Sequence, residues 1–334
     1  MFGEVIPEAR AHVAGELNLP SPDTVVFAPN THDLLVRVVS AVGRKPVRIL
    51  STDGEFHSFR RQAARWEEAG EAMVTRVPIA PFETFPERFL QAARTGGHDL
   101  ILVSQVFFRT GWLVQSLDAL AALADPDGPW VVVDGYHGFM ATPTSLAATA
   151  DRIFYVAGGY KYAMAGEGAC FLHAPPGYGA RPVITGWFAE FGDLEGPPGG
   201  VGYTTDGGRF WGATFDPSAL YRFNAVRRML DREGLHTGAL ADHARNLQAR
   251  FADAVAEGRC GRLKKAELLN PVSGRARRAR FLAFRHAEAQ AMQARLLEAH
   301  VVTDVRDDVL RFGFGAYQDE ADVERLIEIC RRVL

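Results

Sequence analysis

The chain has 334 residues, of which 47% are hydrophobic and 23% are charged, a composition typical of a soluble globular protein. This length allows one large domain with a smaller one attached. The formal net charge of -3 gives no general attraction to nucleic acid or anionic lipid, so we expect neither as a partner.

The cysteines and the first residues point to a reducing compartment. Cys170, Cys260 and Cys330 are odd in number and form no Cys-x-x-Cys pair, which speaks against a disulfide framework or a structural zinc site. The opening MFGEVIPEAR carries acids and lacks the apolar segment of a signal peptide. No apolar run reaches the roughly 18 residues of a membrane span. We therefore expect a cytoplasmic protein without a membrane span.

Short apolar runs alternate with helical patterns through the first half of the chain. The last of these runs are almost continuously apolar, which is typical of strands covered on both faces. We therefore predict an α/β fold with a largely parallel sheet. The predicted strands cover 24–28, 47–52, 72–78, 100–106, 130–135, 153–157 and 169–172, and the helical patterns lie near 31–42, 55–70, 82–95 and 116–124.

The second half begins with a loop-rich stretch at 175–208, and a loop of this length is usually functional or reaches a partner subunit. A long helical pattern at 217–254, broken near Gly234, follows it. Strand patterns at 280–285, 301–305 and 309–314 then alternate with helical patterns at 287–299 and 319–334. We predict an N-terminal segment (1–20), a large domain (21–216), a linking helix (217–255) and a small C-terminal domain (256–334).

Lys161, in the stretch Gly-Gly-Tyr-Lys-Tyr at 158–162, is one of only four lysines among 37 basic residues. Where only a positive charge is needed, this chain nearly always uses arginine. A desolvated lysine amine can lose its proton and condense with an aldehyde, whereas arginine stays protonated. We interpret Lys161 as a Schiff-base lysine for pyridoxal 5'-phosphate (PLP). The alternative is a surface lysine in a loop.

Asp134 ends a run of three valines in the segment Trp-Val-Val-Val-Asp-Gly-Tyr-His at 130–137. An aspartate at the end of a central strand is costly unless it is paired. A protonated pyridine nitrogen is a suitable partner, because the carboxylate keeps the ring charged as an electron sink. His137 could hydrogen-bond this carboxylate or lie against the ring. The alternatives are an Asp134 that caps the following turn and an Asp-x-x-His metal pair, for which no third ligand is evident.

Three further strand ends carry polar or aromatic candidates. Thr31 is placed where a helix N-cap would be, and the free N–H groups of such a helix start suit a phosphate. Phe56 could stack on a planar cofactor ring, with packing in the core as the alternative. Ser104 and Gln105 end another strand, at the edge where open α/β sheets bind ligands.

Arg311 lies in an alternating strand pattern near the C-terminus. Its neighbours on the same face, Val309 and Gly313, are small and leave room in front of the guanidinium. A fork-shaped cation facing a gap suits a carboxylate ligand. The alternative is a structural salt bridge to Asp307 or Asp308. The opposite face carries Leu310, Phe312 and Phe314.

The segments NTHDLL, EFHSF, VVVDGYH, GGYKY, TGWF, RFWGAT and LRFGFGAYQ, in this order, resemble the PLP-dependent class V aminotransferase superfamily, and its kynureninase branch in particular. The resemblance covers roughly residues 24–330. It implies the aspartate-aminotransferase-like fold (fold type I), with a mainly parallel seven-stranded sheet in a large domain plus a small C-terminal α/β domain. It also implies a homodimer with shared active sites.

The resemblance also implies roles at the reacting end of the cofactor. Lys161 would bind the cofactor aldehyde and move the proton of the substrate α-carbon. Asp134 would bind the pyridine nitrogen with support from His137. Phe56 would stack on the ring, and Arg311 would bind the substrate carboxylate.

At the phosphate end, the resemblance implies that Thr31 and the backbone around His32 bind the phosphate alongside Tyr160. Trp187 and Thr214 would reach the phosphate from the partner subunit. Neither a metal nor a second cofactor is implied.

The resemblance implies an enzyme that acts on a small α-amino acid, by transamination or by Cβ–Cγ hydrolysis of the side chain. His57 and Phe59 depart from the proline and aspartate found near the stacking phenylalanine in kynureninases, and Thr214 departs from the usual asparagine. β-Elimination and a cysteine-desulfurase-like reaction stay open, with Cys260 as the candidate cysteine for the latter.

The sequence leaves two other classes of function open. A protein of the same fold that binds PLP without catalysis is one alternative. A nucleotide-binding α/β enzyme is the other, although G-x-G-x-x-G and Walker A patterns are absent. The basic run Arg275–Arg280 is interpreted as a solvated face rather than a nucleic-acid site.

Overall fold

The computed structural model describes residues 1–114, 117–192, 199–270 and 278–334. The chain divides into two compact units. The large unit comprises residues 1–105, 114–140 and 144–233, and the small unit comprises residues 106–113, 141–143 and 234–334. The main division at 233/234 falls inside the range predicted for the linking helix. None of the helices in the described residues is both long and apolar enough to cross a membrane.

The large unit is built on a seven-stranded sheet in the order β1-β7-β6-β5-β4-β2-β3. Strands β2 to β6 run parallel to one another, while β7 is antiparallel to both β6 and β1. The predicted mainly parallel sheet is thereby confirmed. The strands are β1 (Val25–Ala28), β2 (Val47–Thr52), β3 (Ala72–Val77), β4 (Leu100–Ser104), β5 (Trp130–Asp134), β6 (Ile153–Gly158) and β7 (Cys170–His173).

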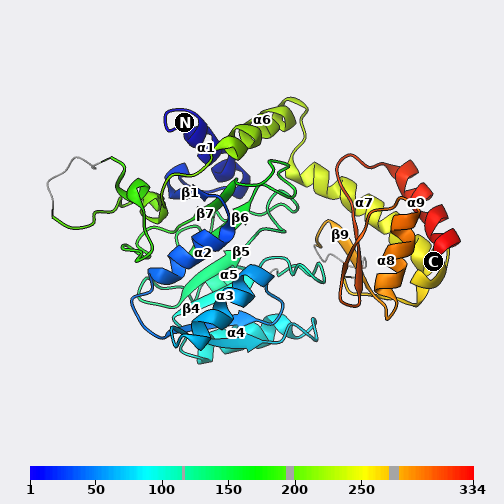
Figure 1. Cartoon of the computed structure of the whole chain (residues 1–334), viewed down its shortest axis with the longest axis horizontal. Helices are drawn as coiled ribbons and strands as arrows, with labels where there is room; N and C mark the ends of the chain where they lie inside the picture. Colours follow the sequence, from blue (N-terminus) through cyan, green and yellow to red (C-terminus); the bar gives the residue numbers. More distant parts are fainter. Residues whose placement is uncertain (115–116, 193–198, 271–277) are drawn as a thin grey trace. The chain divides into compact units, whose positions relative to one another are not determined.

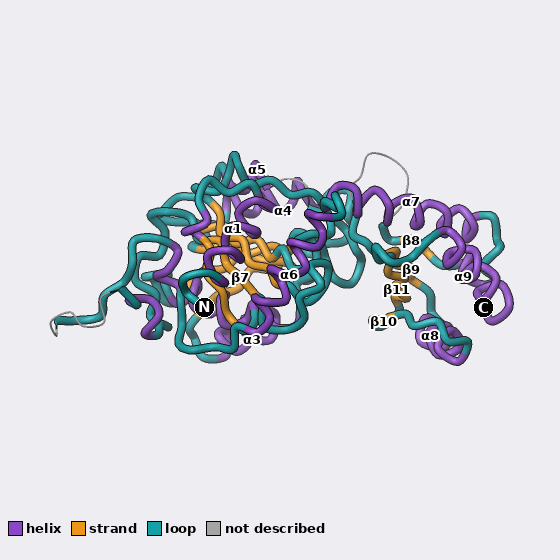
Figure 2. The backbone as a smooth tube through the Cα atoms, turned by 90° about the horizontal axis from the view of Figure 1, so that it is seen from above, coloured by secondary structure: helices purple, strands orange, loops and turns teal. Residues whose placement is uncertain are grey.

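The central strands form the core of this unit because their side chains are apolar on both faces. Every residue of β4 and β6 is buried, and helices and loops enclose the strands (Figure 2). Helix α2 packs on β1, β6 and β7, while α3 and α4 pack on β3. These helices are α2 (Thr31–Ser40), α3 (His57–Glu68) and α4 (Phe85–Thr95), and the short α5 (Leu117–Ala121) follows α4 in the chain (Figure 1).

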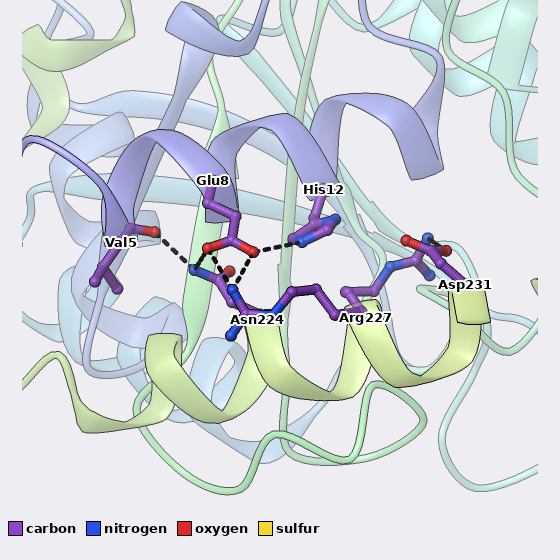
Figure 3. Close-up of polar contacts among 7 residues, drawn as sticks. Val5, Glu8, His12, Asn224, Arg227 and Asp231 are labelled. Carbon is purple, nitrogen blue, oxygen red and sulfur yellow. Dashed lines mark hydrogen bonds and ion pairs between the residues drawn. The ribbon is translucent and has the colours of Figure 1, made fainter. Parts of the chain in front are cut away.

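The segment predicted only as an N-terminal piece contains a helix, α1 (Val5–Leu17), which lies along α6 (Ser218–Arg232) (Figure 3). Asn224 Nδ2 donates to the carbonyl of Val5 (3.0 Å) and to Glu8 Oε2 (3.2 Å). Arg227 forms an ion pair with Glu16 (2.9 Å) in which both side chains are about nine-tenths buried. Polar contacts therefore fix α1 to α6.

The small unit has a four-stranded antiparallel sheet in the order β10-β11-β9-β8. The long helices described in this unit lie on one face of this sheet (Figures 1 and 2). Leu310, Phe312 and Phe314 share one buried cluster with these helices, as the alternating pattern predicts. The elements are α7 (Thr237–Ala256), β8 (Glu267–Leu268), β9 (Phe281–Arg285), α8 (Ala289–Glu298), β10 (Asp304–Arg306), β11 (Val309–Gly313) and α9 (Glu320–Val333).

Two sequence interpretations need correction. The N-cap of α2 is Asn30, whose Oδ1 accepts the N–H of Asp33 (2.9 Å), so Thr31 is the first helical residue rather than the cap. Arg280 is not part of a solvated face, since it is buried and its Nε donates to the carbonyl of Ala141 (3.1 Å). Residues 275–277 of that basic run lie outside the described residues.

Candidate active site

The parallel strands β2, β4, β5 and β6 end at a common edge of the large unit's sheet. Ser104 and Asp134, the last residues of β4 and β5, are direct partners in the strand register. Directly after β4, the N–H of Gln105 donates to the carbonyl of Asp134 (2.8 Å). The topology therefore brings several of the predicted residues to one edge, as open α/β sheets do with their binding sites.

Lys161 lies in the loop after β6. Its Nζ is 4.0 Å from the centre of the Tyr136 ring and 5.9 Å from the centre of the Phe56 ring. The loop closes tightly because Gly159 has no side chain: a Cβ there would come within 2.8 Å of the Cβ of Ala165. The structure thus brings Lys161 and Phe56 together, along with Tyr136, whose involvement the sequence did not indicate.

Asp134 interacts electrostatically with Lys161 and is held by the turn that follows β5. The N–H of Tyr136 donates to Asp134 Oδ1 (3.0 Å), so the turn-capping contact considered as an alternative is present. Burial raises the pKa of Asp134 above its ordinary value, while the Tyr136 N–H and the charge of Lys161 act in the opposite direction. The half-buried imidazole of His137 belongs to the same turn.

Phe56 precedes α3 and is 39% exposed, whereas Phe59, one turn later, is buried. The interpretation of Phe56 as a core residue is therefore wrong. An exposed aromatic face next to an amine and a carboxylate provides three groups suited to PLP: Phe56 for the ring face, Lys161 for the aldehyde and Asp134 for the ring nitrogen. The residues present fit this cofactor.

Glu55 is a buried acid that sequence reasoning missed. Its carboxyl group accepts hydrogen bonds from the hydroxyl groups of Thr52 (2.7 Å) and Ser104 (2.5 Å) and from the Ser104 N–H (3.2 Å). Burial raises the pKa of Glu55 to about 7, and the charge of Asp134 contributes to the rise. The sequence feature that could have indicated Glu55 is its position just after a strand and directly before Phe56.

Three of the residues predicted to bind the phosphate lie in two separate places. His32 lines a cavity of about 780 Å³ together with His57 and three arginines of α3. Trp187 and Thr214 form a separate pair, in which the indole Nε1 donates to the threonine hydroxyl (3.2 Å). The three arginines are Arg60, Arg61 and Arg65.

Tyr160 precedes Lys161 in the chain, and its side chain is 55% exposed. Thr31, in the first turn of α2, is partly buried. The N-terminal end of this helix carries a partial positive charge, which suits an anion. Both residues therefore keep their predicted phosphate role as a hypothesis.

Arg311 belongs to the small unit and already has an anionic partner. Its Nε donates to Asp304 Oδ2 (2.7 Å), and the guanidinium also donates to the carbonyl of Phe108. A salt bridge was the alternative considered for Arg311, but Asp304 on the neighbouring strand is the partner, rather than Asp307 or Asp308. Those two carboxylates lie near Arg109 instead, at 3.6 and 2.7 Å.

Cys260 is fully buried in the core of the small unit and hydrogen-bonds Cys330. A catalytic cysteine on a mobile loop requires exposure to the substrate. The position of Cys260 therefore gives no support to a desulfurase cysteine at this residue.

Comparisons with known proteins give two family matches. Residues 1–260 match the model of the class V aminotransferases, and residues 240–330 match that of the kynureninase C-terminal domain. The chain is 30% identical over 260 residues to a kynureninase of Deinococcus radiodurans, a match that covers 75% of this chain. It spans 59% of the length of that relative.

Solved structures share the fold at low sequence identity. A cysteine desulfurase of Thermococcus onnurineus NA1 superposes with a TM-score of 0.76 at 18% identity, covering 98% of this chain and 83% of that one. A cystine C–S lyase in complex with its product cysteine persulfide gives a TM-score of 0.81 at 18% identity, covering 99% and 87%. These likenesses establish the fold, and the family follows from the sequence match over residues 1–260. The chain belongs to the class V aminotransferase family of pyridoxal-phosphate-dependent enzymes.

Proposed function

We propose that this protein is a kynureninase-like hydrolase that cleaves the Cβ–Cγ bond of an α-amino acid with a carbonyl group on Cγ. The observation that carries the proposal is the position of Lys161 Nζ against the rings of Tyr136 and Phe56, within the electrostatic reach of Asp134. The likeness of the chain to a kynureninase, and of its C-terminal part to the kynureninase C-terminal domain, supports this reaction over others of the family.

The proposal assigns a role in cofactor binding or catalysis to the predicted residues near the sheet edge. When bound, PLP supplies an aldehyde that condenses with amines and a ring that withdraws electrons from the substrate. Lys161 Nζ would hold the cofactor and move the proton at the substrate α-carbon. Asp134 would bind the pyridine nitrogen, because a buried carboxylate is stabilised by a cationic partner, with His137 beside it. Phe56 would lie against the ring face.

The opposite end of the cofactor carries a phosphate. We assign its binding to Thr31, the backbone at His32, and Tyr160. The positive end of α2 and the arginine-lined cavity at His32 both favour an anion there. Trp187 and Thr214 would complete the phosphate site from a second subunit.

A homodimer with shared sites is part of the proposal. Several apolar side chains between residues 183 and 201 are exposed, and exposed apolar groups of this kind commonly mark an interface. A second copy of the chain would cover them and bring Trp187 next to the partner's site. The exposed residues are Val183, Ile184, Trp187, Phe191 and Val201.

The cofactor assignment is tested with Lys161→Arg, which keeps the charge but cannot form an imine. The wild-type protein incubated with PLP should turn yellow and retain the cofactor after borohydride reduction, whereas Lys161→Arg should retain none. Lys45→Arg is the matched control, because Lys45 is an exposed lysine paired with Glu71. A wild-type protein that stays colourless, or a Lys161→Arg protein that traps the cofactor, would overturn the assignment.

The reaction is tested by incubating the enzyme with kynurenine, with an amino donor plus a 2-oxo acid, and with cysteine. Release of anthranilate supports the proposed hydrolysis. A new amino acid would identify a transaminase, and sulfide would identify a desulfurase-like enzyme. No product with any of these substrates would favour a protein that binds PLP without catalysis.

A further inference from the structure

We propose that Glu55 is a positioning residue of the candidate site, which fastens the corner carrying Phe56 to the ends of β2 and β4 beside Asp134. The inference rests on the proposed cofactor role of Phe56 and Asp134. It adds a residue to which the family resemblance gave no role.

The geometry shows what Glu55 holds together. Thr52 is the last residue of β2, Ser104 is the last residue of β4, and both donate hydrogen bonds to the Glu55 carboxyl group. Ser104 in turn pairs in register with Asp134 at the end of β5. The Glu55 side chain therefore contacts the ends of β2 and β4 directly and is linked to the end of β5 through Ser104. Phe56 is the next residue along the backbone.

The contacts of Glu55 suit a neutral carboxylic acid. The side chain is 2% exposed, so a charge there loses almost all of its hydration. Thr52 and Ser104, which face it from β2 and β4, are uncharged, and the charged group that acts on it is Asp134 on β5. Below neutral pH, Oε1 would accept the Thr52 hydroxyl and the Ser104 N–H, while a protonated Oε2 would donate to the Ser104 hydroxyl.

Protonation links this contact to pH. Burial raises the pKa of Glu55 to about 7, from 4.5 in the unfolded chain. The folded protein then binds a proton that the unfolded chain lacks between these two values, so the contribution of Glu55 to stability falls as pH rises from 4.5 to 7. Above pH 7, Glu55 would be ionised in both states and would place a second negative charge near Asp134.

Two substitutions of Glu55 separate the effect of its hydrogen bonds from the effect of its charge. Glu55→Gln imitates the neutral acid, because its amide oxygen can accept the same two hydrogen bonds and its NH₂ group can donate to Ser104. Glu55→Ala removes all of these contacts. Glu68→Gln, on the exposed surface of α3, is the matched control.

The first measurement is the melting temperature of the cofactor-free full-length chain between pH 5 and pH 8. We expect Glu55→Gln to gain about 5 °C relative to wild type as the pH rises across this range, while Glu68→Gln follows wild type throughout. A Glu55→Gln protein whose melting temperature tracks wild type at every pH would overturn the buried, titrating role of Glu55.

The second measurement is the affinity for PLP at pH 6.5, together with the absorbance of the bound cofactor between pH 6 and pH 8.5. Glu55→Gln should stay close to wild type in affinity and lose one pH-dependent change of the absorbance, while Glu55→Ala should bind PLP about tenfold more weakly. Unchanged affinity in Glu55→Ala, or equal losses in both variants, would overturn the positioning role. If wild type binds no PLP, the proposed function fails, and the melting measurement still decides whether Glu55 titrates as inferred.

Discussion

At the scale of single residues, the surroundings of each charged side chain decide which groups are available to a ligand. Lys161 is partly buried, lies against aromatic rings and interacts electrostatically with Asp134, an arrangement that partly shields an amine from water near an acid. Arg311 differs, because Asp304 already neutralises it and 13% of its side chain is exposed. A substrate carboxylate would have to compete with Asp304 for this guanidinium.

Asp304→Asn tests that competition. The substitution keeps the size of the side chain and removes its charge, so we expect KM for the amino acid to fall if Arg311 binds the substrate carboxylate. Arg311→Lys loses the forked hydrogen bonds and should raise KM about tenfold. Asp307→Asn, an exposed neighbour, is the control and should leave KM unchanged. Steady-state kinetics that show no change in any of these variants would make the Arg311–Asp304 pair purely structural.

At the scale of secondary-structure elements, the attachment of α1 to α6 combines a buried and an exposed ion pair on consecutive arginines. Arg227 and Glu16 are 12% and 10% exposed, whereas Arg228 is 58% exposed where it meets Glu8. A buried carboxylate that loses its cation is costly, while a surface pair contributes little. The two arginines should therefore differ strongly in their effect on stability.

Arg227→Gln should lower the free energy of unfolding by about 3 kcal/mol, because the substitution breaks a buried ion pair. Arg228→Gln, one residue away on the same helix, should cost less than about 1 kcal/mol. Urea denaturation followed by circular dichroism measures both. Equal midpoints for the two variants would contradict the buried role of the Arg227 ion pair.

The elements with strong periodic patterns could be predicted from the sequence, and the weaker or tertiary features could not. The strands predicted at 47–52 and 130–135 match β2 and β5 closely, because the apolar residues of each strand are followed by clear polar residues. Helix α1 was missed although Ile6, Val13 and Leu17 lie at helical spacing, since Pro7 and small residues weaken the pattern.

The same limit applies to the candidate site. Lys161 and Asp134 stood out because each follows an apolar strand, which the sequence alone displays. Glu55 did not, because its burial depends on Ser104, which is 49 residues away in the chain. The partner of Arg311 depended on the register of β10 against β11, and no local pattern encodes that register.

At the scale of the whole molecule, the role proposed for the exposed segment around Trp187 requires a second subunit. The aromatic side chains there pack on one another, with the Trp187 and Phe191 rings 5.2 Å apart. Trp187 is nevertheless 45% exposed, which is costly for so large an apolar group. The cytoplasmic location remains a prediction from composition.

Mixing two inactive variants tests whether the sites are shared. Lys161→Ala removes the amine of a subunit's own site, and Trp187→Ala removes the group proposed to reach the partner's site. A hybrid dimer would contain one complete site, so an equimolar mixture should regain about a quarter of wild-type activity. Each variant alone stays inactive or nearly so. A sedimentation experiment that finds only monomers, or a mixture that regains nothing, would contradict the shared site.

The small unit combines segments that are far apart in the chain, and this limits the order in which the protein can fold. Val106 and Leu113, made in the first third of synthesis, are buried with Phe281 and Val309 on one face of the small sheet, and the carbonyl of Gly111 accepts the N–H of Ala279 (3.3 Å). A fragment that starts at residue 234 would therefore lack Val106 and Leu113 and would expose the hydrophobic face of the sheet that they cover. During synthesis on the ribosome, residues 106–113 can pack against Phe281 and Val309 only after nearly the whole chain has emerged. A truncated product would therefore be prone to aggregation.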